Sequence, residues 1–390
     1  MIAFDIDDQN SLAMATIKVI GVGGAGGNTV NSMIKSNVGN IEFIVANTDA
    51  QALKLSQAQH KIQLGVKLTK GLGAGANPEI GRRAAEEDLE KILEAVGNAD
   101  IVFLAAGMGG GTGSGATSVI AKTLRENGIL TVAVVTKPFQ FEGKRREKIA
   151  LETIEELRKN VDTLIVIPNQ KLLEVTKNTV SMIDAFAMIN EVLTNSVKGI
   201  ADIITRPGHI NVDFADLKVI MKDKGLAVMG TGKAVGEHRA MEAALHAISS
   251  PLLENMSIKG AKSVLINITG GQNVGLHEIN EAASVIYEQA DQDANIILGA
   301  VIDESLEKEL IITIVATGFD HQESAQEVHV KGTVVDQQEV AHKTPLVENV
   351  QPQQPVVAKE APKPQLVAQL NDLDVPTFMR KQQALQDSAE

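Results

Sequence analysis

The chain has 390 residues, which is enough for two or three domains that each bury a sizeable core. Its net charge of −13 argues against a nucleic-acid-binding surface, and the lack of cysteine excludes disulfides, thiolate metal sites and a cysteine nucleophile. No apolar run approaches the roughly 20 residues of a transmembrane helix, and the N-terminus lacks the features of a signal peptide. We therefore expect a soluble, cytoplasmic protein that neither binds nucleic acid nor inserts into a membrane.

The N-terminal region starts with residues 1–15, which hold several acids without a hydrophobic period and are expected to form a mobile arm. A strand at 16–20 runs into a loop with the pattern G-x-G-x-x-G at 21–26, and a helix is expected from about 28 to 35. Asp49, after the next strand, lies roughly where a dinucleotide-binding Rossmann unit keeps its ribose-binding acid. By itself this region is compatible with a nicotinamide or flavin enzyme.

A second glycine-rich run at 107–115 changes that interpretation, because one dinucleotide fold needs only one such loop. The run contains six glycines and lies between an apolar stretch at 101–106, typical of a buried strand, and a helical pattern that ends at 127–128. Glycine lets backbone N–H groups approach an anion, and the helix dipole favours negative charge, so the pattern predicts a phosphate-binding loop. Thr112 and Ser114 add two hydroxyl donors. A flexible linker would not lie between a buried strand and a helix.

Further strands alternate with helices along the first half of the chain. A loop at 71–77 ends in an asparagine suited to cap a helix, which proline opens and which is expected to run to about residue 96. A strand at 129–136, a helix at 142–159 and a strand at 164–168 follow. Alternating strands and helices predict a parallel sheet covered on both faces, with ligands at the carboxyl ends of its strands.

The longest helical pattern spans residues 181–205. Its first half is apolar nearly all round, so we expect the helix to be buried between two layers and to join two domains. A second α/β domain is expected over 225–317, where the run at 230–234 lacks the Ser or Thr that follows the lysine of a Walker loop. A P-loop NTPase is therefore disfavoured. The strands of this domain are expected at 263–269, 295–302 and 309–317.

The character of the chain changes after residue 318. Residues 321–370 contain five of the eleven prolines and no aromatic residue, a composition typical of a disordered tether. Residues 373–381 then regain apolar anchors and positive charge, which is typical of a partner-binding peptide at the end of a tether. A featureless tail is the alternative that composition alone leaves open.

Two acids, Asp213 and Asp216, stand at the predicted start of a helix near residue 214. Asp213 can cap that helix, and a spacing of three places both acids on the same face of its first turn. A cap and a solvated acid are the ordinary roles for such residues. That interpretation leaves the predicted nucleotide domain without an evident acid to orient a water molecule.

Several of these segments resemble motifs of the tubulin/FtsZ family of GTPases. The phosphate-binding run GGGTGSG at 109–115 resembles the family signature, although Ser114 stands where many members have threonine. The other matching segments, in family order, are GAGANPE at 73–79, PFQFEGKRR at 138–146, IPN at 167–169, NVDFAD at 211–216 and DVPTFMRKQ at 374–382.

The resemblance implies a set of site residues. Those expected to contact the nucleotide are Gly23, Gly24, Asn28, Asn47, Gly73, Ala74, Gly107, Gly110, Gly111, Thr112, Gly113, Glu142, Arg146, Asn169, Phe186 and Asn190. The loop at 71–77, which by composition alone is equally well explained as a mobile connection, would face the γ-phosphate. Phe186 would stack on guanine, although core packing is the favoured role for this residue without the resemblance. Asn211, Asp213 and Asp216 would enter the nucleotide site of the next subunit and act on the attacking water or a cation.

The resemblance also implies a fold and a function. The fold would comprise a Rossmann-like GTP-binding domain (16–180), a central helix (181–206), a second α/β domain with the catalytic loop (207–318), a linker (319–370) and a terminal peptide (371–390). The protein would bind GTP or GDP with Mg²⁺, polymerise head-to-tail and hydrolyse GTP in a division ring at midcell, beneath the inner membrane. The peptide would bind membrane-tethering and regulatory partners of the FtsA and ZipA kinds. The alternatives are a dinucleotide-binding oxidoreductase and a scaffold that polymerises without hydrolysis.

Overall fold

The computed structural model describes residues 15–176, 180–206, 208–210, 212–250 and 258–319. All of them fall in one compact unit, and the second unit, from residue 325 to residue 390, lies outside the described residues. The predicted N-terminal arm (1–15) has only its last residue within the described part. The predicted linker has only its first residue there, and the terminal peptide has none. The structure therefore leaves these three predictions open.

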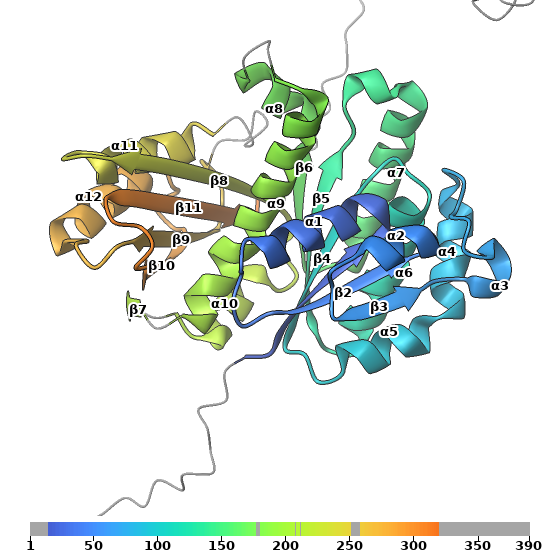
Figure 1. Ribbon diagram of the computed structural model, residues 1–390. Coiled ribbons are helices and arrows are strands. Elements are labelled where there is room, and N and C mark those ends of the chain that lie inside the picture. Colours follow the sequence, from blue (N-terminus) through green and yellow to red (C-terminus); the bar gives the residue numbers. More distant parts are fainter. Residues whose placement is uncertain (1–14, 177–179, 207, 211, 251–257, 320–390) are drawn as a thin grey trace, which may run out of the picture. The chain divides into compact units, whose positions relative to one another are not determined.

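The strands and helices follow the predicted alternation over the first half of the chain (Figure 1). In order, the elements there are β1 (Ile17–Val22), α1 (Gly23–Lys35), β2 (Glu42–Asn47), α2 (Ala50–Leu55), β3 (His60–Gln63), α3 (Val66–Thr69), α4 (Pro78–Glu87), α5 (Leu89–Val96), β4 (Ile101–Gly107), α6 (Thr112–Glu126), β5 (Leu130–Lys137), a 3-10 turn (Gln140–Glu142), α7 (Lys144–Asn160), β6 (Thr163–Pro168) and α8 (Asn169–Val175).

The second half begins with the long helix and continues as a mixed α/β region. Its elements are α9 (Met182–Thr205), β7 (Gly208–Ile210), α10 (Phe214–Met221), β8 (Gly225–Val235), α11 (Arg239–Ile248), β9 (Ser263–Gly270), α12 (Leu276–Tyr287), β10 (Asn295–Ile302) and β11 (Glu309–Thr317).

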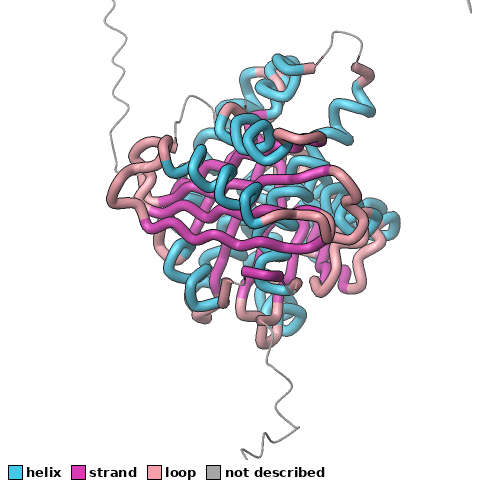
Figure 2. The backbone as a smooth tube through the Cα atoms, turned by 90° about the vertical axis from the view of Figure 1, so that its left-hand side faces the viewer, coloured by secondary structure: helices cyan, strands magenta, loops and turns pink. Residues whose placement is uncertain are grey.

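Among the described residues, eleven strands form one sheet in the order β3-β2-β1-β4-β5-β6-β8-β11-β9-β10-β7. The strands from β3 to β6 are all parallel to their neighbours, as predicted, and β6 pairs with β8 in parallel over only three residues. Beyond this junction, β11 lies antiparallel to both β8 and β9. Helices lie on both sides of the strands (Figure 2). The tubulin/FtsZ-like α/β fold predicted from the sequence is thus confirmed.

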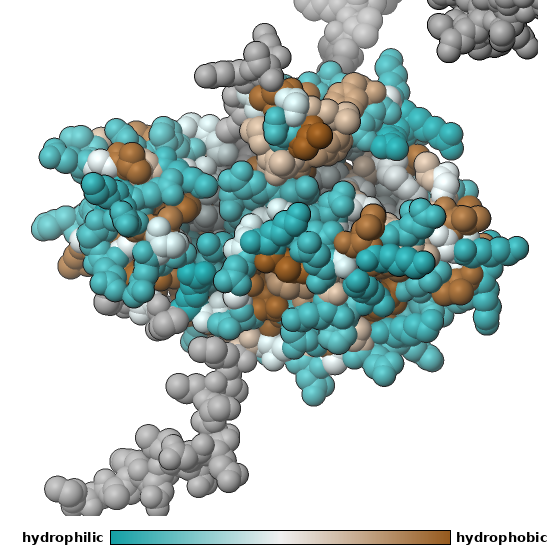
Figure 3. All heavy atoms as spheres, viewed as in Figure 1, coloured by the Kyte–Doolittle hydropathy of each residue, from teal (hydrophilic) through white to brown (hydrophobic). Residues whose placement is uncertain are grey.

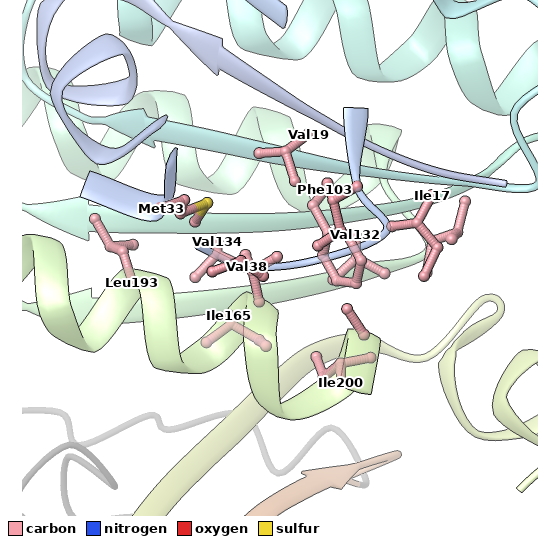
Figure 4. Close-up of a cluster of buried hydrophobic side chains, with 14 of the residues drawn as sticks. Ile17, Val19, Met33, Val38, Phe103, Val132, Val134, Ile165, Leu193 and Ile200 are labelled. Carbon is pink, nitrogen blue, oxygen red and sulfur yellow. The ribbon is translucent and has the colours of Figure 1, made fainter. Parts of the chain in front are cut away.

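The second half of α9 is buried against the sheet. Leu193, Val197 and Ile200 join a core cluster that holds residues of β1, β4, β5 and β6 and also residues of β8, β9 and β11. Figure 4 shows Leu193 and Ile200 of α9 in the same buried cluster as Val134 and Ile165 of the strands. Helical spacing of the apolar residues explains why one helix can pack on strands from both parts of the sheet.

The first half of α9 does not match the prediction of burial. Met182 and Ile183 are 67% and 77% exposed, and Phe186 is 41% exposed. Figure 3 shows hydrophobic side chains over the region of α8 and the start of α9. An apolar composition therefore indicated the wrong environment for these side chains, because the described elements that contact the first half of α9 leave them largely exposed.

Two further boundaries differ from the predictions, and the structure also explains the glycines of the run at 230–234. Helix α1 starts at Gly23, five residues before the predicted start, so the glycine loop itself forms the first turn of the helix. The helix predicted over 78–96 is two helices that meet at Asp88. The run at 230–234 is part of β8, where a side chain on Gly230 or Gly232 would meet backbone oxygens of α11 at 2.0 Å. Close packing of α11 on β8 explains these glycines.

None of the described helices is long and apolar enough to cross a membrane.

Candidate functional site

The predicted phosphate-binding run connects β4 to α6, at the carboxyl end of the parallel strands. Among the described residues, no side chain caps the start of α6, so the backbone N–H groups of its first turn are available to an anion. The Gly109 N–H donates to Ser114 Oγ at 2.9 Å, which closes the loop on itself. Ser114 thus accepts a hydrogen bond inside the loop, and its hydroxyl hydrogen can still serve as the donor that the sequence suggested.

The first glycine loop lies against this helix start. Gly23 has a φ of +72°, and a Cβ on it would lie 2.9 Å from the Gly113 nitrogen and 3.4 Å from Thr112 Cβ. A Cβ on Gly107 would meet Ala25 Cβ at 2.6 Å. The two predicted loops are therefore in contact, and their glycines permit an approach that larger residues would prevent.

The loop at 71–77 closes the same site from another side. A Cβ on Gly111 would lie 2.8 Å from Ala74 Cβ and 2.9 Å from the Asn77 nitrogen. As predicted, Asn77 caps α4, with its side chain accepting from the Glu79 N–H at 3.0 Å. The three predicted glycine-rich loops thus converge on the N-terminus of α6, the geometry that phosphate groups require.

A threonine that the sequence did not single out touches the predicted phosphate-binding hydroxyl. Thr48 Oγ1 and Thr112 Oγ1 are 2.6 Å apart, and Thr48 is completely buried. The Thr48 carbonyl also accepts from the Gly73 N–H at 3.3 Å. Thr48 therefore connects the phosphate-binding run with the loop at 71–77. The one feature of the sequence that pointed to Thr48 was its place directly after Asn47, a predicted nucleotide contact.

The acid and the arginine of the predicted ribose side form a pair. Arg146 Nη1 lies 2.5 Å from Glu142 Oε2, and Glu142 Oε1 accepts from the Phe139 N–H at 3.0 Å. A Cβ on Gly109 would meet the Arg146 carbonyl oxygen at 2.7 Å, so the start of α7 lies against the phosphate-binding run. Arg146 is half-exposed, so its guanidinium is accessible to a ligand at this edge of the site.

The residues predicted to hold the base lie at the starts of α8 and α9. Phe186 is partly exposed and makes an edge-to-face contact with Phe139, with ring centroids 5.6 Å apart. Asn169 is buried, and its Oδ1 has no hydrogen-bond partner within the described structure. Asn190 Oδ1 accepts from Thr29 Oγ1 at 3.2 Å. An exposed aromatic ring and an unpaired buried acceptor are features of a site that receives a purine.

The remaining predicted contacts lie in the first glycine loop and the helix that it opens, in the phosphate-binding run, and at the end of β2. Gly24 and Asn28 are exposed on α1, and Asn47 is buried with its Oδ1 accepting from the Asp49 N–H at 3.2 Å. Asp49 caps α2 by accepting from the N–H groups of Gln51 and Ala52. Asp49 therefore has a structural role as a helix cap. Its position, which had suggested the ribose-binding acid of a dinucleotide fold, is explained without a ribose.

The predicted catalytic acids lie at the opposite end of the strands. Asp213 caps α10, as predicted, and its Oδ1 accepts from the Asp216 N–H at 2.7 Å. Both acids are exposed. The next residue, Phe214, lines a hollow with residues 97–100 and 127–129, which precede β4 and β5. The acids are thus near the amino ends of strands whose carboxyl ends carry the phosphate-binding loops. Asn211, the third predicted residue, lies outside the described residues.

Ion pairs fix the end of α9 just before these acids. Arg206 Nε lies 3.1 Å from Asp202, and Arg206 Nη1 lies 3.0 Å from Asp303 in the loop between β10 and β11. Burial raises the pKa of Asp202, while Arg206 and Lys198 act in the opposite direction. This cluster defines where the chain leaves α9 toward Asp213.

No group of three or more His, Cys, Asp or Glu side chains that could hold a metal ion occurs in the described part of the chain.

Two sequence families match this chain. The Tubulin/FtsZ family, GTPase domain, matches residues 16–177, and the FtsZ family, C-terminal domain, matches residues 225–320. Among solved structures, an empty FtsZ dimer from M. jannaschii is 46% identical, with a TM-score of 0.75 over 78% of this chain and 88% of that one.

More distant structures share the fold. The GDP-bound monomer of CetZ1 from Haloferax volcanii is 22% identical, with a TM-score of 0.69 over 78% of this chain and 95% of that one. The GTPγS-bound protofilament of CetZ2 from the same organism is 19% identical, with a TM-score of 0.66 over 79% and 94%.

A parallel sheet with glycine loops gathered at one helix start, joined through a long helix to a second α/β region, defines a GTPase of the tubulin type. The chain belongs to the FtsZ family. It is accordingly an FtsZ-like cytoskeletal GTPase whose family binds GTP and GDP, and the oxidoreductase alternative has no support from these findings.

Proposed function

We propose that this protein polymerises head-to-tail and hydrolyses GTP between successive subunits, as part of a division ring. One observation carries the proposal: Asp213 and Asp216 are exposed at the amino ends of the strands, whereas the phosphate-binding loops lie at the carboxyl ends. β4 alone has seven residues, or about 23 Å at 3.3 Å per residue, so these acids cannot reach the nucleotide of their own subunit.

A second subunit can bring the two halves together. If the end that carries Asp213 and Asp216 meets the nucleotide end of the next subunit, the acids can orient a water molecule against the γ-phosphate. A head-to-tail contact that does not close into a ring produces an open filament. The known dimer of FtsZ and protofilament of CetZ2 support self-association as the mode of assembly.

Each part of the site then has a distinct task. The glycine loops and the start of α6 hold the phosphates, Arg146 and Glu142 contact phosphate and ribose, and Asn169, Phe186 and Asn190 hold guanine. Magnesium, when bound, would neutralise charge that develops on the phosphates. Asn211, Asp213 and Asp216 would serve the nucleotide of the neighbour.

The cellular setting belongs to the same proposal. The polymer would lie in the cytoplasm at midcell, beneath the inner membrane, and residues 373–381 would bind FtsA-like and ZipA-like tethers. Family membership supports this assignment. The division into domains at 16–180, 181–206 and 207–318 is likewise a proposal, since one sheet runs through both parts of the described chain.

The shared site can be tested with two variants and their mixture. Asp216→Ala should bind GTP with near-normal affinity and hydrolyse it slowly, because its own phosphate loops are intact. Thr112→Ala should bind GTP poorly but still offer an intact Asp216. At a GTP concentration too low to fill the Thr112→Ala site, the mixture should show more phosphate release than the two separate samples together.

The wild-type protein supplies the control. Its GTPase activity per subunit should rise with protein concentration above a threshold, because the site forms only on assembly. If specific activity stays constant on dilution and mixing restores no GTPase activity, each chain contains a complete site and the proposal fails.

A further inference from the structure

The C-terminal end of α10 is held by residues from both parts of the sheet. The hydroxyl of Thr163, at the start of β6, donates to the Met221 carbonyl. The hydroxyl of Thr317, at the end of β11, donates to the Ile220 carbonyl at 2.9 Å. The last carbonyls of a helix lack partners within the helix, so these two contacts fix the end of α10 in space.

A charged cluster holds the turn that follows. Arg125, in the last turn of α6, forms an ion pair with Asp223, lies 3.5 Å from Asp162 Oδ1 and donates to the Lys159 carbonyl at 3.1 Å. Asp223 has a φ of +56°, an uncommon conformation for a residue other than glycine. The ion pair with Arg125 helps to hold the backbone there.

Asp162 is the buried centre of this cluster. Its side chain is 4% exposed and accepts from the Thr131 N–H at 2.9 Å and from the Asp223 N–H at 3.4 Å. Its carbonyl accepts from the N–H groups of Lys224 and Gly225, each at 2.9 Å. A buried carboxylate depends on such partners, so the loss of Arg125 would disturb the whole turn.

The first turn of α10 is anchored as well. Val212, just before the helix, is buried in the core cluster, and Phe214 packs against that cluster. Phe214 and Lys218 also face residues 97–100 and 127–129 across a hollow of about 390 Å³. The hollow has mostly polar walls and nothing in the structure indicates an occupant. The direction in which α10 presents its first turn therefore depends on the contacts at its C-terminal end as well as on those of Val212 and Phe214.

We propose that Arg125, acting through Asp162 and Asp223, is a positioning residue for Asp213 and Asp216. Helix α6 starts in the phosphate-binding run and ends at this cluster, so it links the two halves of the shared site within one subunit. This inference rests on the proposed function, because it assumes that the acids act on the neighbour's nucleotide. Arg125 itself touches neither acid.

The test compares Arg125→Ala with a matched control on the same helix. Lys122→Ala removes the same charge from α6, but Lys122 is exposed and pairs only with Glu126 at 3.9 Å among the described contacts. Arg125→Ala should keep GTP affinity within about twofold and lose about tenfold or more in GTPase activity per subunit, because small misplacement of a reacting group is costly. Lys122→Ala should behave as wild type.

Mixing shows on which end of the subunit the defect lies. Arg125→Ala mixed with Thr112→Ala should recover activity, because the Thr112→Ala subunit provides well-positioned acids. Arg125→Ala mixed with Asp216→Ala should recover none, because both subunits are defective at the same end. A merely unstable protein would not distinguish the two partners.

Two further variants protect the test against misfolding. Asp223→Asn keeps a residue that tolerates a positive φ and removes the charge, and it should show the same pattern as Arg125→Ala. Arg125→Lys should retain intermediate activity. If Arg125→Ala and Asp223→Asn are as active as wild type, or if both mixtures behave alike, the inference is wrong. If the Asp216→Ala and Thr112→Ala mixture also fails, the proposed shared site is at fault instead.

Discussion

At the scale of single residues, Thr112 connects the predicted site to contacts that only the fold reveals. Its hydroxyl lies 2.6 Å from that of Thr48, and either oxygen can be the donor. If Thr48 donates, the Thr112 hydroxyl hydrogen is free for a phosphate oxygen. Thr48 would then orient Thr112 toward the nucleotide.

Thr112→Ala should therefore weaken GTP binding. Loss of one hydrogen bond corresponds to about 0.5–1.5 kcal/mol, or about two- to tenfold in affinity, and to more if the partner is a charged phosphate. Direct binding of labelled GTP would measure the change. Thr112→Ser, which keeps the hydroxyl, should bind as wild type does. Equal GTP affinity of the alanine variant and wild type would show that Thr112 does not touch phosphate.

The sequence predicted the glycines and acids of the site better than their partners. Each glycine loop can be predicted from its local composition, and Asp213 and Asn77 stand where a helix cap is expected. Thr48 and Thr29 carry no such local signal, because their partners lie 64 and 161 residues away. Contacts of this kind depend on how strands and helices are placed in three dimensions.

At the scale of elements, the contact between α4 and α6 positions the loop at 71–77. A Cβ on Gly115 would lie 1.9 Å from the Pro78 carbonyl oxygen, and one on Gly81 would lie 2.4 Å from the Gly111 carbonyl oxygen. Arg82 of α4 also pairs with Glu156 of α7, and this hydrogen bond lowers the pKa of Glu156. Helix α4 is thus packed directly onto the start of α6.

Gly115→Ala should separate these two helices. Overpacking of a close contact costs about 1–3 kcal/mol, so the free energy of unfolding measured in urea should fall by that amount. GTP affinity should fall with it, because Ala74 and Asn77 would move away from Gly111. Gly39→Ala is the matched control, since a Cβ there meets nothing within 4 Å. If Gly115→Ala is as stable as Gly39→Ala, the helices are not as closely packed as described.

Element boundaries were predicted where local signals are strong and missed where packing decides them. Alternating strands and helices, the Asn77 cap and the end of α6 could all be inferred from sequence. The exposed first half of α9 could not, because an apolar helix surface looks alike whether it is buried or left open. Likewise, the glycines of β8 are explained only by the approach of α11.

At the scale of the whole molecule, the described chain presents two different ends. Phosphate-binding loops lie at the carboxyl ends of the parallel strands, and exposed acids lie at their amino ends. The sequence predicted both groups of residues, but only the resemblance to a family suggested that they serve neighbouring subunits. The distance between them along the strands now gives that arrangement a physical reason.

The described chain ends just after the last strand of the sheet. Phe319 packs against the core cluster of the second part of the chain, and β11 ends two residues earlier. A chain that ends at Phe319 therefore keeps both groups of site residues and every described strand. It should fold, bind and hydrolyse GTP and form filaments much as the full chain does, because the described residues up to 319 form three hydrophobic core clusters and carry both groups of site residues.

What the shortened chain should lose is attachment to partners. If residues 373–381 bind membrane-bound tethers, only the full chain should co-sediment with lipid vesicles that carry such a tether, while both chains should pellet as filaments with GTP. A full chain with Phe378→Ala provides the matched control, because it keeps the linker and changes one apolar anchor. It should polymerise normally and bind tethered vesicles weakly. Failure of the shortened chain to fold or polymerise would place the boundary of the folded region beyond Phe319, and undiminished vesicle binding would exclude the terminal peptide as the attachment site.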